Sequence, residues 1–239
     1  MQYYICNPST EESVAIPAHP QNDYPWNVAL IFYPFYKLVH IQRKPFEMSI
    51  FSPETREWAS RSLDLDPTIV HSPWIFRNIF FNGSLYKLSL GYLLKFDIDQ
   101  MGVRAIELPK IVVRDNPIGC LGVSQGSLHY AWDDGKSQML IWTLGEGSAT
   151  EEWLLKHTIC HQYFIEHPLW SSIDDSTPFS VYAFHPSSDL LFVGNLSGVY
   201  SFDRATKGLE NIFRTGLSGM PELTDLTSLL GISMRKKTA

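Results

Sequence analysis

Four short β-segments, separated by tight turns, recur along this chain and constrain its fold more than any other feature. The clearest copy runs from Trp74 to Leu108, with turns at Asn82–Gly83, at Gly91–Tyr92 and at Asp99–Gly102. Asn and Gly accept the positive φ that a two-residue hairpin turn demands. The segments between the turns carry apolar and aromatic residues that suit a pleated, half-buried surface. This stretch therefore predicts one four-stranded antiparallel meander.

The meander repeats with a period near 45 residues. The turn between the last two segments of each copy falls at Pro8, Pro53, Asp97, Thr143 and Asp203, with gaps of 45, 44, 46 and 60 residues. A long connector over residues 160–178 accounts for the wide last gap. Four strands per period of this length are typical of β-propeller blades. A β-sandwich also has strands at short intervals, but it does not require a long period to recur. We therefore predict an all-β fold, a β-propeller of four-stranded antiparallel blades.

The pattern predicts four full blades and the outer half of another. The half blade is Tyr3–Asn7 with Ser13–Ile16. The full blades are Val28–Tyr33, Tyr36–Ile41, Phe46–Phe51 and Glu57–Leu63; Trp74–Phe81, Leu85–Leu90, Leu93–Ile98 and Val103–Leu108; Gly119–Val123, Leu128–Trp132, Met139–Leu144 and Trp153–Ile159; Phe179–Phe184, Leu190–Gly194, Val199–Phe202 and Leu209–Phe213.

Residues 1–215 are expected to form the propeller domain, whereas residues 216–239 lack a strand pattern. We expect this C-terminal tail to be poorly ordered or to hold a short helix over residues 221–230. Because the chain starts within a blade at Tyr3, we expect an incomplete, open ring. An open ring exposes strand edges and apolar faces, which promotes aggregation or partner binding.

Charge and cysteine content narrow the class of protein. The formal net charge of −6 argues against nucleic acid or an anionic membrane as the main partner, because phosphate binding needs concentrated Lys and Arg. No apolar run has the length of a membrane span. The three cysteines, Cys6, Cys120 and Cys160, are odd in number and widely spaced, which favours a reducing compartment. We therefore expect a cytoplasmic or nuclear protein.

Five short motifs, in this order and spacing, carry a family resemblance over residues 3–213. They are Tyr4-Ile5-Cys6-Asn7-Pro8-Ser9-Thr10, Ile50-Phe51-Ser52-Pro53-Glu54-Thr55 with Trp58, Asn82-Gly83-Ser84-Leu85-Tyr86, Leu94-Lys95-Phe96-Asp97 leading to Ile106-Glu107-Leu108-Pro109, and Val199-Tyr200-Ser201-Phe202-Asp203. The chain thereby resembles the F-box-associated β-propeller domain of plant F-box proteins. The resemblance implies that, in that family, an N-terminal F-box docks on a Skp1-type adaptor and the propeller captures the protein to be ubiquitinated.

The resemblance predicts a protein-binding module similar to the substrate receptor of an SCF-type E3 ubiquitin ligase, with an unknown protein substrate as its partner. The sequence before Tyr3 holds no helical F-box, so a Skp1-type adaptor is an expected partner only if an F-box lies upstream. One alternative is a free-standing propeller scaffold or decoy that delivers nothing to a ligase. Another is a sugar-active enzyme of propeller fold.

Candidate catalytic and metal-binding groups are sparse in the sequence. His157, Cys160 and His161 lie close together, but they lack a matching pair of ligands elsewhere. The adjacent pairs Asp133-Asp134 and Asp174-Asp175 have turn or loop composition. The expected inner strands Val28–Tyr33, Gly119–Val123 and Phe179–Phe184 carry no carboxylate. We therefore predict no enzyme, no metal site and no cofactor.

Aromatic and cationic residues in loops at one rim are the candidates for contact with a partner. These loops lie between the second and third strands of a blade and between blades, and side chains of these types dominate interface hot spots. Trp132 has an alternative role in packing between blades, and Arg43 and Lys44 could simply be solvated. The candidates are Arg43, Lys44, Tyr92, Trp132, Lys136, Tyr163 and Trp170.

Overall fold

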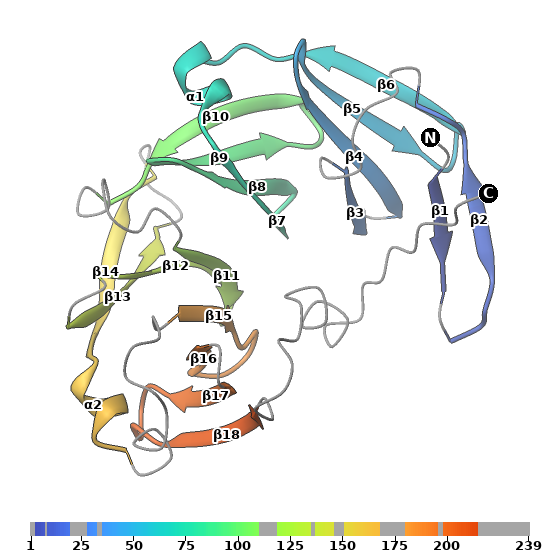
Figure 1. Cartoon of the computed structure of the whole chain (residues 1–239). Helices are drawn as coiled ribbons and strands as arrows, with labels where there is room; N and C mark the ends of the chain where they lie inside the picture. Colours follow the sequence, from blue (N-terminus) through green and yellow to red (C-terminus); the bar gives the residue numbers. More distant parts are fainter. Residues whose placement is uncertain are drawn as a thin grey trace. The chain divides into compact units, whose positions relative to one another are not determined.

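The computed structural model describes residues 3–7, 9–19, 28–32, 35–109, 119–134, 137–145, 151–167, 180–195 and 198–214. Apart from two short helices, the regular structure in these ranges consists of antiparallel β-sheets (Figure 1). The described residues up to Asp66 belong to one compact unit, and those from Pro67 onward belong to a second.

The first unit contains a hairpin and one four-stranded meander. Its core packs Ile16 from the hairpin with Val28, Leu38 and Phe51 from the meander. The indole Nε1 of Trp58 donates a 3.0 Å hydrogen bond to the carbonyl oxygen of Pro17, just after the hairpin. The strands are β1 (Tyr3–Cys6), β2 (Ser13–Ile16), β3 (Val28–Phe32), β4 (Tyr36–Arg43), β5 (Phe46–Ser52) and β6 (Glu57–Ser62).

The second unit contains three four-stranded meanders. In each, strands that are neighbours in sequence pair antiparallel. The first sheet is β7 (Trp74–Phe81), β8 (Ser84–Ser89), β9 (Tyr92–Asp97) and β10 (Gly102–Glu107). The second is β11 (Cys120–Ser124), β12 (Ser127–Asp133), β13 (Gln138–Leu144) and β14 (Trp153–Cys160). The third is β15 (Ser180–Phe184), β16 (Leu190–Asn195), β17 (Gly198–Asp203) and β18 (Leu209–Arg214). The two helices are α1 (Pro67–His71) and α2 (Gln162–Ile165).

The prediction of an all-β chain built from four-stranded antiparallel meanders is confirmed, and most strand boundaries agree within one or two residues. Thr143, which the period places at a turn, lies inside β13, because this strand continues to Leu144. The segment between the first two full blades, for which the sequence predicts only a connector, contains α1, and the connector over residues 160–178 contains α2. Pro67 suits the first position of α1, where its fixed φ and missing N–H carry little penalty. The expected tail and its boundary at residue 215 lie outside the described residues.

Two of the tight turns have the backbone conformation that the sequence indicates. Asn82 and Gly83, between β7 and β8, have φ of 46° and 71°. Gln125 and Gly126, between β11 and β12, have φ of 49° and 72°. A positive φ at both central residues is the hallmark of a type I′ turn, whose twist matches that of the flanking strands. These turns therefore favour hairpins at both places.

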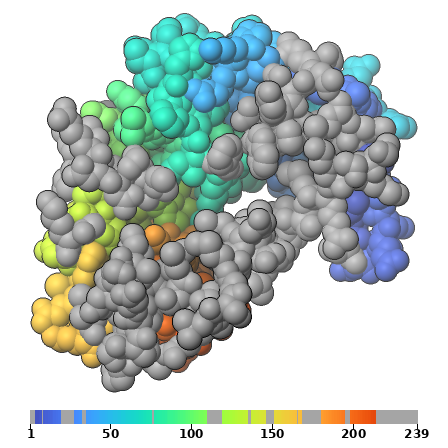
Figure 2. Space-filling model, in the orientation of Figure 1, coloured from blue at the N-terminus to red at the C-terminus, as the bar shows by residue number. Residues whose placement is uncertain are grey.

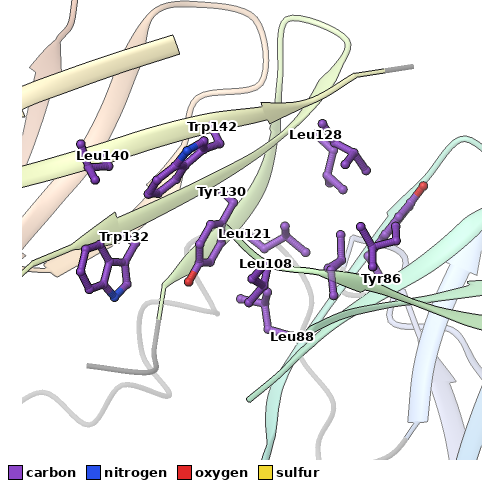
Figure 3. Packing of buried hydrophobic residues seen from close by; sticks show 12 residues of the cluster. Tyr86, Leu88, Leu108, Leu121, Leu128, Tyr130, Trp132, Leu140 and Trp142 are labelled. Atoms are coloured by element: carbon purple, nitrogen blue, oxygen red, sulfur yellow. The ribbon is translucent and has the colours of Figure 1, made fainter. Parts of the chain in front are cut away.

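Each sheet of the second unit packs against the next through alternating side chains. In β12, Leu128, Tyr130 and Trp132 belong to the hydrophobic cluster shared with the β7–β10 sheet, whereas Ala131 belongs to the cluster shared with the β15–β18 sheet. Successive side chains of a strand point to opposite faces, so β12 is buried on both. In Figure 3, Leu88 and Leu108 lie next to Leu121 and Tyr130 in the first of these two interfaces.

The first strands of the three sheets lie together. Residues of β11 contact those of β7 on one side and those of β15 on the other. In Figure 1 the strands β7, β11 and β15 lie on the inner side of this unit, and β10, β14 and β18 lie on the outer side. Figure 1 also shows α2 on this outer side, just after β14.

Candidate functional site

The structure describes five of the seven predicted partner-binding residues. In the first unit, Arg43 ends β4 and is half-buried, and Lys44 lies exposed in the turn that follows. In the second unit, Tyr92 begins β9 and is half-buried. Lys136 and Trp170 lie outside the described residues.

Trp132 belongs to the hydrophobic core. Its side chain is only 7% exposed and packs in the cluster between the β7–β10 and β11–β14 sheets (Figure 3). This is the alternative role that the sequence left open for it. The cause is the alternation of β12, which places Trp132 on the same face as Tyr130. A side chain buried to this extent offers little surface to a partner.

Among the described aromatic candidates of the second unit, Tyr163 is the most exposed. It lies on α2 and is 53% exposed, and its neighbour Phe164 is buried against Phe202, with ring centroids 4.8 Å apart. The ammonium group of Lys207 lies 5.7 Å from the centroid of the Tyr163 ring. Figure 2 shows the golden segment that contains β14 and α2 at the surface. Phe164 therefore anchors the short helix, and Tyr163 is presented to solvent from a fixed base.

A polar cluster lies beside this helix, where β12 and β14 end. The Nε2 atom of His161 lies 2.7 Å from Oδ2 of Asp133. The Oδ1 atom of Asp134 accepts hydrogen bonds from the backbone N–H groups of Ser137 at 2.7 Å and Gln138 at 2.9 Å. Among the described residues, Asp133, Asp134 and His161 form a group whose metal-ligating atoms all lie within 4.8 Å of one another.

Strand register brings this cluster together. Asp133 pairs with Met139 between β12 and β13, and Gln138 pairs with Cys160 between β13 and β14. The ends of β12 and β14 therefore meet at one edge of the sheet. In the sequence, Asp133-Asp134 and His161 belong to separate motifs, because His161 follows Asp133 by 28 positions. The predicted antiparallel pairing of β12, β13 and β14 is the signal that could have joined them.

The interface between the β11–β14 and β15–β18 sheets holds a second group of polar side chains. The guanidinium of Arg204 donates from Nη2 to Oδ1 of Asp189 at 2.7 Å and from Nε to its carbonyl oxygen at 3.1 Å. Burial lowers the pKa of His157, and the positive charge of Arg204 lowers it further. The charges of Arg204 and Asp189 therefore act on His157, although both residues are distant from it in the sequence.

The first strand of each four-stranded meander lacks the acidic side chains that a sugar-active enzyme would use. Strands β3, β7, β11 and β15 contain no Asp or Glu. A pair of facing carboxylates, which a sugar-active enzyme needs, therefore cannot come from these four strands. Of the helices in the described ranges, none combines the length and the apolar character needed to cross a membrane.

Comparisons with known proteins identify a likeness of fold and no family. No family model matches the chain, and no curated protein matches its sequence. A solved structure of a puromycin-hydrolyzing peptidase from Mycobacterium tuberculosis is similar with a TM-score of 0.50 and 6% identity, over 85% of this chain and 33% of that chain. The N-terminal domain of Nup159 is similar with a TM-score of 0.45 and 12% identity, over 77% of this chain and 46% of that chain.

The chain spans a third of the length of the peptidase chain and less than half of the Nup159 chain. At 6% identity, the likeness to the peptidase concerns the arrangement of the strands and not the activity of that protein.

Proposed function

We propose that the chain is a propeller-type protein-binding module, whose four-stranded sheets are blades arranged about a common axis. The observation that carries this proposal is the contact of the first strand β11 with the first strands β7 and β15 of the two other sheets. Blades of a propeller meet in this way, because a four-stranded sheet cannot bury both of its faces alone. The regular recurrence of the meander in the sequence supports the same arrangement.

We further propose that this module captures a protein and acts as the substrate receptor of an SCF-type E3 ubiquitin ligase, in the cytoplasm or nucleus. The order and spacing of the five sequence motifs support the comparison with F-box-associated domains. Tyr163 supports a role in binding, since an exposed aromatic side chain on a fixed base loses little conformational entropy when a partner covers it.

Quantitative affinity capture tests the binding role. The tagged chain and its Tyr163→Ala variant are used to capture proteins from a plant cell extract, and Val14→Ala serves as the control. Val14 is 52% exposed and lies in the hairpin of the first unit, so its truncation removes a similar exposed apolar group. We expect specific partners whose recovery drops at least tenfold with Tyr163→Ala and is unchanged with Val14→Ala. Equal recovery with all three proteins would exclude Tyr163 from the binding surface.

Reconstituted ubiquitination separates a ligase receptor from a scaffold or decoy. The chain is fused behind an F-box segment of known adaptor affinity, assembled with a Skp1-type adaptor and the remaining ligase subunits, and incubated with a captured partner. We expect ubiquitin to be attached to the partner, and Tyr163→Ala to reduce this. A partner that binds the assembled ligase without being modified would favour the scaffold or decoy.

A further inference from the structure

We propose that Asp133, Asp134 and His161 bind a divalent metal cation. This inference goes beyond the proposed capture of a protein and differs from the sequence analysis, which predicts no metal site. Two carboxylates and one imidazole supply three ligand atoms of types that bind first-row divalent metals. The two carboxylates also carry the charge that balances a divalent cation. All three ligand atoms already lie within 4.8 Å of one another.

The β11–β14 sheet holds these groups in place through its backbone. Asp133 is the last residue of β12, and His161 follows the last residue of β14. The backbone N–H of His161 donates a 2.8 Å hydrogen bond to the carbonyl oxygen of Ser137, in the turn that also carries Asp134. Strand pairing and this hydrogen bond therefore bring the backbone positions of the three residues together before any cation binds.

The carboxylate of Asp134 accepts hydrogen bonds from the protein, and such bonds typically orient a side chain that binds a metal. Its Oδ1 accepts from the N–H groups of Ser137 and Gln138, and its Oδ2 lies 3.4 Å from the Ser137 hydroxyl oxygen. Such hydrogen bonds fix the direction of a ligating carboxylate. Asp133 is 7% exposed and His161 is 16% exposed, so a cation here would be only partly hydrated. Partial burial strengthens the attraction between the cation and the carboxylates.

A hydrogen bond already joins two of the ligand atoms. Asp133 Oδ2 and His161 Nε2 are 2.7 Å apart, so a bound cation would take the place of the proton between them. Carboxylate oxygen and imidazole nitrogen together suit a first-row divalent cation such as Mn²⁺, with water molecules in the remaining positions.

Calorimetric titration of the full chain with MnCl₂, after chelator treatment and dialysis, tests the site. We expect saturable binding of one Mn²⁺ per chain, weakened at least tenfold by Asp133→Asn and by His161→Gln. His157→Gln is the matched control, because His157 lies on β14 outside the three-residue group. It should leave the affinity unchanged. The absence of saturable binding to the wild-type chain, or unchanged affinity in His161→Gln, would overturn the proposal.

A second measurement needs no variant and so does not depend on how a variant folds. Pulsed electron paramagnetic resonance of wild-type chain loaded with one equivalent of Mn²⁺ detects nitrogen bound directly to the metal. We expect the nitrogen coupling of one imidazole. A spectrum that shows coupling to water protons but none to nitrogen would assign the cation to surface carboxylates and contradict the proposed site.

Discussion

The Nη1 atom of Arg77 donates a 2.6 Å hydrogen bond to the carbonyl oxygen of Tyr182, which lies 105 residues further along the chain. The same nitrogen lies 3.7 Å from the sulfur of Cys120. One side chain of β7 therefore reaches both β11 and β15, the first strands of the next two sheets. Burial raises the pKa of the Cys120 thiol to about 11, and the nearby guanidinium only partly opposes this, so the thiol remains protonated at neutral pH.

Replacing Arg77 should loosen the contact among the three first strands. Arg77→Met removes the hydrogen bond to Tyr182 but keeps much of the aliphatic stem. We expect a loss of about 1 kcal/mol in the free energy of unfolding, because the arginine is exposed to solvent and the bond is partly replaced by water. Urea denaturation measures the loss. Arg56→Met, in the exposed turn after β5, is the control and should change stability by less than about 0.5 kcal/mol.

Close packing of β11 on β15 can be tested at a glycine. A methyl group added to Gly122 would lie 2.7 Å from Cδ2 of Phe184, too close for an ordinary contact. We expect Gly122→Ala to cost about 1–3 kcal/mol, as overpacking of a core does. Gly102→Ala is the matched control, because a methyl group there meets nothing within 4 Å. Thermal unfolding should separate the two variants, and equal midpoints would contradict this packing of the sheets.

The hydrogen bonds of His129 fit a neutral imidazole. Its Nε2 lies 3.2 Å from the carbonyl oxygen of Ser124, which can only accept, so this nitrogen carries the proton. Its Nδ1 can then accept from the hydroxyl of Thr143 at 3.0 Å. Burial lowers the pKa of His129 from 6.5, and the positive charge of Arg204 lowers it further.

This lowered pKa predicts that stability falls in acid. Between the ordinary value of 6.5 and the lower folded value, the unfolded chain binds more protons than the folded chain. The contribution of His129 is therefore complete above pH 6.5 and is lost as the pH falls through its folded pKa. His129→Gln should flatten the decline in unfolding free energy measured by urea titration between pH 7 and pH 5. An unchanged slope in this variant would assign the acid sensitivity to other groups.

Lys87 carries a buried ammonium group with one neutral partner. Its Nζ donates a 2.9 Å hydrogen bond to Oδ1 of Asn78, and burial lowers its pKa from 10.5 to about 8. The unfolded chain therefore binds more protons between pH 8 and 10.5, so stability should rise with pH across that window.

An apolar side chain of similar length should remove this dependence. We expect Lys87→Met to stabilise the fold by about 1–2 kcal/mol at pH 7, because the cost of burying a charge outweighs the single hydrogen bond. The gain should shrink as the pH approaches 10.5. Lys156→Met, at an exposed position of β14, is the control. A destabilised Lys87→Met variant at pH 7 would show that the ammonium group is better solvated than its burial indicates.

The fold was predictable from the sequence where neighbours in the chain decide it. The turn at Asn82–Gly83 and the alternating residues around it specify a hairpin locally, and repetition of that pattern specifies the number of meanders. The candidate site was predictable only in part. Tyr163 is exposed, and its role in binding stays a prediction, whereas Trp132 is a core residue, because alternation along β12 decides which face it occupies.

The sequence by itself determined where the strands lie, where they turn and how often the unit recurs, because hairpins form between segments that adjoin in the chain. Only the tertiary structure decided which side chains meet across those segments. Asp133 reaches His161 through strand register, and Arg77 reaches Tyr182 through the packing of separate sheets. Contacts of this kind depend on strand register and on how the sheets stack. The residues next to each partner in the sequence do not determine either of these.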